Sequence, residues 1–172
     1  MNKVILETNR LLLREMTRDD YPALAAILQD AETMRAYEHA FSDDETQKWL
    51  DRQLRLYKED GFGLWAVVLK ATGQMIGDCG VCRHMVDNEA LPEISYHFNR
   101  RHWHNGYAAE AASACKNHAF TTLGFDRVCS VIRDTNLASI NVAIRNGMLA
   151  RKRLVRHYWG MDMPHIVFVA NK

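Results

Sequence analysis

Residues 92–111 read PEISYHFNRRHWHNGYAAEA and combine a strand, a polar loop and the start of a helix. The alternation in residues 93–99 predicts the strand, and alanines at helical spacing predict a helix over residues 107–123. The first N–H groups of a helix have no internal partners, and the helix dipole adds partial positive charge there. Gly106 lacks a Cβ, so a phosphate can come close to the backbone. The stretch therefore predicts an anion site in front of this helix.

The loop itself does not name the anion. Arg100 and Arg101 add positive charge beside Gly106. However, the loop has one glycine where phosphate loops of nucleotide hydrolases have two, and it lacks their G-K-[ST] ending. The Rossmann fingerprint is absent as well. Small residues on one face of the following helix predict close packing on a sheet; these are Ala108, Ala111, Ala112, Cys115 and Ala119.

The rest of the chain alternates between strand and helix patterns. Helices are expected after Thr17 or Asp19, over residues 42–58, and from Asn136 to before Gly147. Ser42 with Glu45 forms a capping box, and Trp49, Leu50, Leu54 and Tyr57 then line one stripe. Strands are expected at 4–14, 64–70, 75–85, 93–99 and 127–133, and in a final hairpin at 149–159 and 164–170. This order predicts an α/β fold with helices on both faces of one sheet.

Composition is that of an ordinary globular protein. The chain has 172 residues, 48% of them hydrophobic and 25% charged, with a formal net charge of +1. This length predicts one domain over residues 1–172. The charge balance gives no reason to expect a nucleic-acid or membrane partner. The longest apolar run, residues 64–69, is too short to cross a bilayer, and no signal peptide is visible, so a cytoplasmic protein is expected.

Four cysteines raise the question of a metal or redox site. Cys79 and Cys82 form a C-x-x-C, which in other contexts is half of a zinc site or a redox pair. Here the pair lies in a strand pattern, and residues three apart on a strand point to opposite faces. No second C-x-x-C or H-x3-H follows. The pair is therefore expected to be structural, with no metal bound.

Four segments together resemble the Gcn5-related N-acetyltransferase (GNAT) superfamily, over nearly the whole chain. They are ETNRLLLREMTRDD, PEISYHFNRRHWHNGYAAEA, DTNLASINVAIRNGM and HIVFVA. The likeness is greatest to the branch with the ribosomal-protein alanine N-acetyltransferases RimJ and RimL. The resemblance implies a single GNAT-type domain with a mixed, mostly antiparallel central sheet of about six to seven strands. It also implies that the anion is the pyrophosphate of acetyl-CoA, which serves as co-substrate.

The family motif Q/R-x-x-G-x-G/A implies the cofactor-binding residues. It falls on Trp103, His104, Asn105, Gly106, Tyr107 and Ala108. His104 stands where the branch usually has glycine, in W-G-K-G-Y-A, so the freedom of φ that glycine provides is missing. In the family, the strand before the loop pairs its backbone with the pantetheine arm. The matching residues are Tyr96, His97 and Phe98.

Acetyl transfer needs a base for the amine and a proton donor for the leaving thiolate. Family members often use a tyrosine as donor, but Ala143 stands at that position. In this branch a serine three residues after the asparagine often serves, which implies Ser139, with Asn136 both capping the helix and contacting the cofactor arm. Glu93 is the first candidate for the base. His97 or a water relay is the alternative, and an edge carboxylate with no catalytic role is as consistent with the position of Glu93.

These residues lead to an acetyl-CoA-dependent N-acetyltransferase that acts by direct transfer to a primary amine, either a protein N-terminus or a small molecule. The alternative is a catalytically weak acyl-CoA-binding module that acts as a sensor or scaffold. A third possibility, RNA binding by the basic run at 151–157, competes with a simple solvated strand face. By analogy of fold, residues 35–41 and 42–58 line the acceptor pocket. The protein is expected to be a monomer or homodimer.

Overall fold

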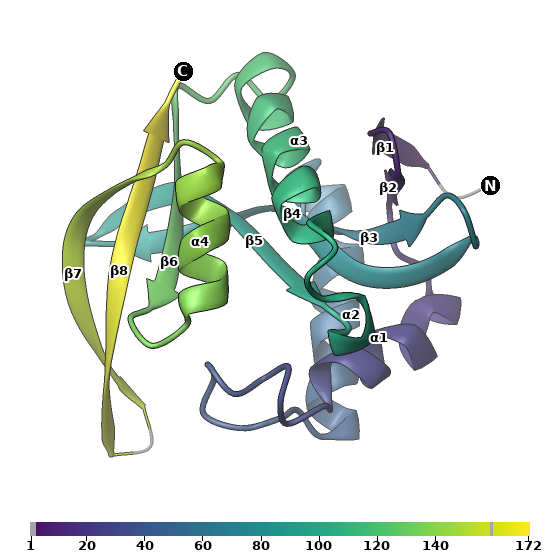
Figure 1. Ribbon diagram of the computed structural model, residues 1–172, viewed down its shortest axis with the longest axis horizontal. Helices are drawn as coiled ribbons and strands as arrows, with labels where there is room; N and C mark the ends of the chain where they lie inside the picture. The colour runs from purple at the N-terminus through teal and green to yellow at the C-terminus, as the bar shows by residue number, and fades with distance from the viewer. Residues whose placement is uncertain (1–2, 159) are drawn as a thin grey trace.

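The computed structural model describes residues 3–158 and 160–172, and it contains an eight-stranded sheet with helices on both faces (Figure 1). The strand order is β1-β2-β3-β4-β5-β6-β8-β7. The strands are β1 Val4–Glu7, β2 Leu11–Arg14, β3 Leu64–Leu69, β4 Gln74–Val86, β5 Glu89–Phe98, β6 Arg127–Arg133, β7 Leu149–Tyr158 and β8 Met161–Asn171. The helices are α1 Tyr21–Leu28, α2 Asp43–Glu59, α3 Tyr107–Thr121 and α4 Leu137–Arg145, with short 3-10 turns at Arg18–Asp20 and Arg100–His102.

The sheet has one strand more than the upper expected number. The single strand expected over residues 4–14 is a hairpin of β1 and β2, in which the Thr8 N–H donates to the Leu11 carbonyl across a tight turn. Asn9 is the single turn-forming residue between two runs of β-compatible side chains, and it was not enough to show the break. All neighbouring strands are antiparallel except β5 and β6, as expected for a mixed, mostly antiparallel sheet.

Two apolar layers hold the helices to the sheet. Four small residues of α3, Ala111, Ala112, Cys115 and Ala119, are fully buried against one face, which confirms the predicted close packing. On the other face, Leu24 and Leu28 of α1 pack with Leu50 of α2. The Ser42–Glu45 capping box is confirmed: Ser42 Oγ accepts from the Glu45 N–H at 3.2 Å, and Glu45 Oε2 accepts from the Ser42 N–H at 2.8 Å.

The C-x-x-C cysteines lie on opposite faces of β4, as the alternation predicted. Cys79 is buried in the α3 layer, with its Sγ 3.5 Å from the Sγ of Cys115. Cys82 is buried in the α1–α2 layer. Burial raises the pKa of both thiols well above the ordinary value. The two side chains are therefore kept protonated and pack as small apolar groups.

Candidate active site

The site forms where β5 and β6 separate. These parallel neighbours are in register at Glu93 and Cys129, and Ser130 Oγ donates to the Ile94 carbonyl at 2.8 Å just beyond. After that link, β5 turns away from β6 (Figure 1). The first turn of α4 faces the opening, where the Tyr96 hydroxyl donates to the Ser139 carbonyl at 3.1 Å. A wedge therefore opens in the sheet at the end of β5.

The backbone of β5 offers hydrogen bonds to this wedge. The Asn99 N–H donates to the Ile76 carbonyl of β4 at 2.9 Å, and the His97 N–H donates to the Asp78 side chain at 3.0 Å. Backbone N–H groups alternate sides along a strand. The N–H groups of Tyr96 and Phe98 therefore point to the side away from β4, into the wedge, where an extended arm can pair as an added strand.

The loop before α3 keeps the shape of a glycine loop despite His104. His104 has a φ of 61° and Gly106 a φ of 79°, so both adopt the left-handed conformation. For a histidine this conformation costs on the order of 1–2 kcal/mol. The structure therefore retains the turn that glycine would allow at residue 104, and the free N–H groups at the start of α3 remain directed at the loop.

A clamp from the β1–β2 turn holds the loop in place. Arg10 Nη1 donates to the Asn105 carbonyl at 2.9 Å, and its guanidinium lies 4.5 Å from the centre of the Tyr107 ring. Glu110 accepts from Arg10 Nε at 2.7 Å and from the Thr8 hydroxyl at 2.5 Å. Burial opposes ionisation of Glu110, but these hydrogen bonds outweigh it, so its pKa lies below the usual value. Glu110, in the first turn of α3, thus has a structural role.

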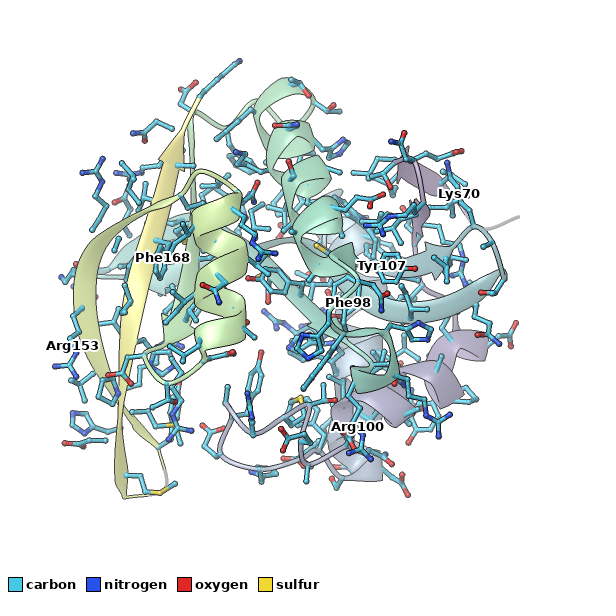
Figure 2. The ribbon with its side chains drawn as sticks, viewed as in Figure 1. Lys70, Phe98, Arg100, Tyr107, Arg153 and Phe168 are labelled. Carbon is cyan, nitrogen blue, oxygen red and sulfur yellow. The ribbon has the colours of Figure 1, made fainter. Side chains whose placement is uncertain are left out.

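A cavity of about 320 Å³ runs from this loop to the wedge. It brings together ten of the predicted cofactor-binding residues: Tyr96, His97, Phe98, Trp103, His104, Gly106, Tyr107, Ala108, Asn136 and Ser139. Asn105 does not line it, because its side chain donates to the carbonyls of His102 and Trp103. Figure 2 shows Phe98 and Tyr107 near the middle of the molecule, where β5 ends and α3 begins.

The arginines that line this cavity are not the two that were expected to add positive charge to the loop. Arg100 and Arg101 do not line it, and Arg100 pairs instead with Asp30 at 3.4 Å. Arg35 and Arg145 line the cavity. The 3-10 turn at Arg100–His102 carries the two predicted arginines on its exposed side, an orientation that the sequence pattern could not indicate.

Asn136 and Ser139 begin α4 beside the wedge. Asn136 Oδ1 accepts from the Ser139 N–H at 3.2 Å, which confirms the predicted cap. The Ser139 hydroxyl has no partner within the described part of the chain and is free to donate into the cavity. Ala143, at the position of the family tyrosine, is only 2% exposed and packs in the same apolar cluster as the buried residues of α3.

A second cavity of about 420 Å³ lies next to the first, and we call it the acceptor cavity. Both cavities are lined by the same five residues, Ala36, Tyr37, Tyr96, Asn136 and Ser139. Ala36 and Tyr37 come from the segment between α1 and α2, which passes below α4 in Figure 1. The two cavities therefore meet beside the Ser139 side chain.

Glu93 lines the acceptor cavity and is held firmly. Its Oε1 accepts from the Val131 N–H at 3.0 Å, and its Oε2 lies 2.8 Å from His84 Nδ1. Arg156 Nη2 contacts the other imidazole nitrogen, Nε2 of His84. Because a guanidinium can only donate, this nitrogen accepts, and Nδ1 carries the proton given to Glu93. A carboxylate accepts about four hydrogen bonds, so Glu93 has capacity left for an amine or a water.

His97 links the buried Asp78 to Tyr37, a residue that is 38% exposed. Its Nδ1 lies 2.7 Å from Asp78 Oδ1, and its Nε2 lies 2.5 Å from the Tyr37 hydroxyl. Trp49 Nε1 donates to the second Asp78 oxygen at 3.3 Å. Both ring nitrogens of His97 are thus occupied, and any effect on an acceptor would pass through Tyr37. Burial and the nearby carboxylates Glu93 and Asp78 raise the pKa of the Tyr37 hydroxyl, so it stays protonated.

Replacement of Asp78 by asparagine is expected to lower the free energy of unfolding by about 1–3 kcal/mol, because an amide group would face donors that now meet a carboxylate. Asp78 is 0% exposed. The measurement is urea denaturation, with the exposed Asp19→Asn as control. Equal stability of the two variants would show that the Asp78 network contributes nothing to the fold.

Comparison with known proteins identifies the family. Residues 10–149 match the family model described as the acetyltransferase (GNAT) domain. This chain belongs to the GNAT acetyltransferase family. Two relatives of the acetyltransferase come from Bacillus subtilis (strain 168). The uncharacterized protein YkkB is 37% identical, covering 85% of this chain and 86% of that protein. The uncharacterized N-acetyltransferase YoaA is 30% identical, covering 90% and 87%.

Solved structures agree with this fold. An acetyltransferase from Agrobacterium tumefaciens superposes on this acetyltransferase with a TM-score of 0.82 and 26% identity, covering 97% of this chain and 94% of that chain. RimL, a ribosomal L7/L12 α-N-protein acetyltransferase solved with coenzyme A, superposes with a TM-score of 0.79 over 98% of both chains. At 16% identity, the RimL comparison supports the fold alone. Members of the family use acetyl-CoA.

None of the helices in residues 3–158 and 160–172 is long and apolar enough to cross a membrane. No group of three or more histidine, cysteine or acidic side chains in this part is arranged to hold a metal ion.

Several residues of the site were not predicted individually. Tyr37 was covered only by the expectation that residues 35–41 line the acceptor pocket. Arg156 was covered only as part of the basic run at 151–157, and Asp78, Arg10 and Arg133 were given no role. Each is brought to the site by strand pairing or by a loop far away in sequence, which no local pattern indicates.

Proposed function

We propose that this acetyltransferase moves the acetyl group of acetyl-CoA directly to a primary amine, with residues 1–172 acting as one catalytic domain. The observation that carries the proposal is the meeting of the two cavities beside Ser139. One cavity combines an anion-binding loop with the open backbone of β5. The other contains a buried carboxylate, Glu93, as a place for an amine.

The pyrophosphate of the co-substrate would lie at the N–H groups from about 104 to 108, and its pantetheine arm would pair with the backbone of Tyr96 and Phe98. This arrangement directs the thioester toward Ser139. Anchoring both reactants removes much of the entropic cost of bringing them together.

Side chains of the site can serve both proton transfers of the reaction. Glu93, directly or through a water, takes a proton from the acceptor ammonium, and the free amine attacks the carbonyl carbon of the thioester. The C–N bond forms and the C–S bond breaks, and the new amide nitrogen releases its second proton to solvent. The thiolate takes a proton from the Ser139 hydroxyl, which regains one from solvent. No covalent intermediate with the protein is required.

Within the family, we place this chain near the RimJ and RimL branch. Support comes from tryptophan at the first motif position, Trp103, and from Ser139 in place of the tyrosine donor. The name of YoaA, an N-acetyltransferase, supports transfer to nitrogen.

The test is product formation. Purified protein is mixed with acetyl-CoA and a panel of amines: amino acids, peptides, polyamines and aminoglycosides. We expect release of the free thiol together with an acetylated amine. Tight binding of acetyl-CoA with no product from any amine would favour the alternative, a binding module that acts as a sensor or scaffold.

Replacing Glu93 by glutamine is expected to lower kcat about 100-fold at neutral pH, the lower end of the usual contribution of a general base. The loss is expected to shrink as the pH rises, since more of the amine is then deprotonated by solvent alone. The measurement is a pH profile of kcat, with Glu38→Gln in the same cavity as the control. A rate loss that is constant across the profile would show that Glu93 holds the structure and does not take the proton.

A further inference from the structure

The acceptor cavity contains more arginine than its carboxylates can neutralise. Its walls include four arginines, Arg52, Arg83, Arg133 and Arg156, but only two acids, Glu38 and Glu93. Arg83 pairs with Asp60 at 3.5 Å. The other three arginines have no carboxylate partner among the residues that the structure describes. Arg52 is exposed and lies over the Trp49 ring, whereas Arg133 and Arg156 are half-buried. Half-buried cations without a partner are costly, and they are typical of sites that bind an anion.

Arg156 reaches into the cavity from the edge strand β7. Its neighbour Arg153 instead points outward in Figure 2 and pairs with Asp134 at 3.0 Å. Arg156 Nη1 donates to the Tyr158 hydroxyl at 3.0 Å, and Nη2 contacts His84. Since the same imidazole ring touches Glu93, only the width of that ring separates the guanidinium from the carboxylate.

Arg133 approaches the cavity from β6. Its Nη1 makes only long contacts of 3.5 Å to the carbonyls of Arg35 and Ala36, and its Nε is buried with no hydrogen-bond partner in the described part of the chain. Burial, with a contribution from Arg133 and Arg156, lowers the pKa of His165 on the same wall. The two guanidinium groups therefore act on the same wall of the cavity.

We infer that the natural acceptor is a small amine that also carries a carboxylate or phosphate, held with its amine at Glu93 and its anionic group at Arg133 and Arg156. The inference rests on the proposed function and names the substrate class of the same site. Guanidinium groups bind both oxyanions through paired hydrogen bonds. A volume of about 420 Å³ lies at the lower end of small-molecule sites and fits a compact acceptor. A polyamine or aminoglycoside would place further positive charge against the arginines.

The first experiment measures binding, so it does not depend on turnover. Protein saturated with coenzyme A is titrated by calorimetry with matched pairs of amines. The pairs are L-amino acids with their amides, and O-phosphoethanolamine with ethanolamine. We expect at least one acid-bearing member to bind about 10- to 100-fold more tightly than its uncharged partner, as for a hydrogen bond to a charged group. The two kinds of pair distinguish carboxylate from phosphate.

The second experiment removes the arginines. Arg156→Gln and Arg133→Gln should each abolish most of this preference, and Arg156→Lys should restore part of it. Arg151→Gln, on the same strand but outside both cavities, is the matched control and should keep the preference. The affinity for coenzyme A should stay unchanged in all four variants, because none of these residues lines the first cavity, at the loop before α3. This readout shows that each variant is folded.

The outcomes separate the two levels of inference. If acid-bearing amines bind through the arginines but are not acetylated, the transfer reaction is wrong and the anion site stands. If amines are acetylated but the amides or polyamines serve equally well, the anion site is wrong and the transfer stands. Binding of no acid-bearing amine, or clear preference for a peptide over the free amino acid with the same first residue, also overturns the inference.

Discussion

Replacing Ser139 by alanine is expected to lower kcat about 10- to 1,000-fold, the usual effect of losing one hydrogen bond made in the transition state. The affinity for acetyl-CoA should change much less, since the interaction develops only as the thiolate leaves. The structure makes this variant a clean test. The cap at the start of α4 uses the Ser139 N–H, and Tyr96 bonds to its carbonyl, so alanine keeps both interactions.

The measurement is steady-state kinetics with varied acetyl-CoA, and Ser113→Ala on α3 is the matched control, because Ser113 lines neither cavity. A loss confined to KM for acetyl-CoA would make Ser139 a binding residue. An unchanged kcat would assign the proton to water or to the Tyr96 phenol. Burial raises the pKa of Tyr96, so its hydroxyl stays protonated and could donate. A loss of kcat in Tyr96→Phe would identify the Tyr96 phenol as the donor, and no loss would leave water.

Replacing Gly106 by valine is expected to weaken the binding of coenzyme A at least about 100-fold. A Cβ at this position would lie 3.6 Å from Arg10 Nη2, and the methyl groups of valine would crowd the loop whose N–H groups are proposed to bind the phosphates. Loss of two charge-assisted hydrogen bonds, at about 1.5–3 kcal/mol each, gives at least this factor. Valine is also strained at a φ of 79°, so the melting temperature should fall by several degrees.

Gly124→Val separates these two effects. Gly124 has a nearly equal φ of 74° and open space around its Cβ position, but it follows the far end of α3 and lines neither cavity. Calorimetry at a temperature where both variants are folded should find the normal affinity for coenzyme A in Gly124→Val and a large loss in Gly106→Val. Equal affinities in the two variants would show that the pyrophosphate lies elsewhere.

The amino-acid sequence by itself determined the local elements of this protein. The capping box at Ser42, the cap at Asn136 and the small-residue face of α3 were all predicted correctly. Each depends on residues within about four positions along the chain, where helix geometry sets the contacts. The turn and helix start at Gly106 were predicted for the same reason, and the resemblance to GNAT enzymes implied acetyl-CoA as the ligand.

The tertiary structure alone decided which distant groups share the site. Arg10 meets Glu110 across 100 residues of sequence, and His97 meets Tyr37 across 60. Arg153 and Arg156 belong to one basic run, yet one faces solvent and the other enters the acceptor cavity. These partnerships follow from the strand order, in which β8 lies between β6 and β7 and β5 separates from β6. A local pattern carries no information on that order, because it arises from the packing of the whole sheet.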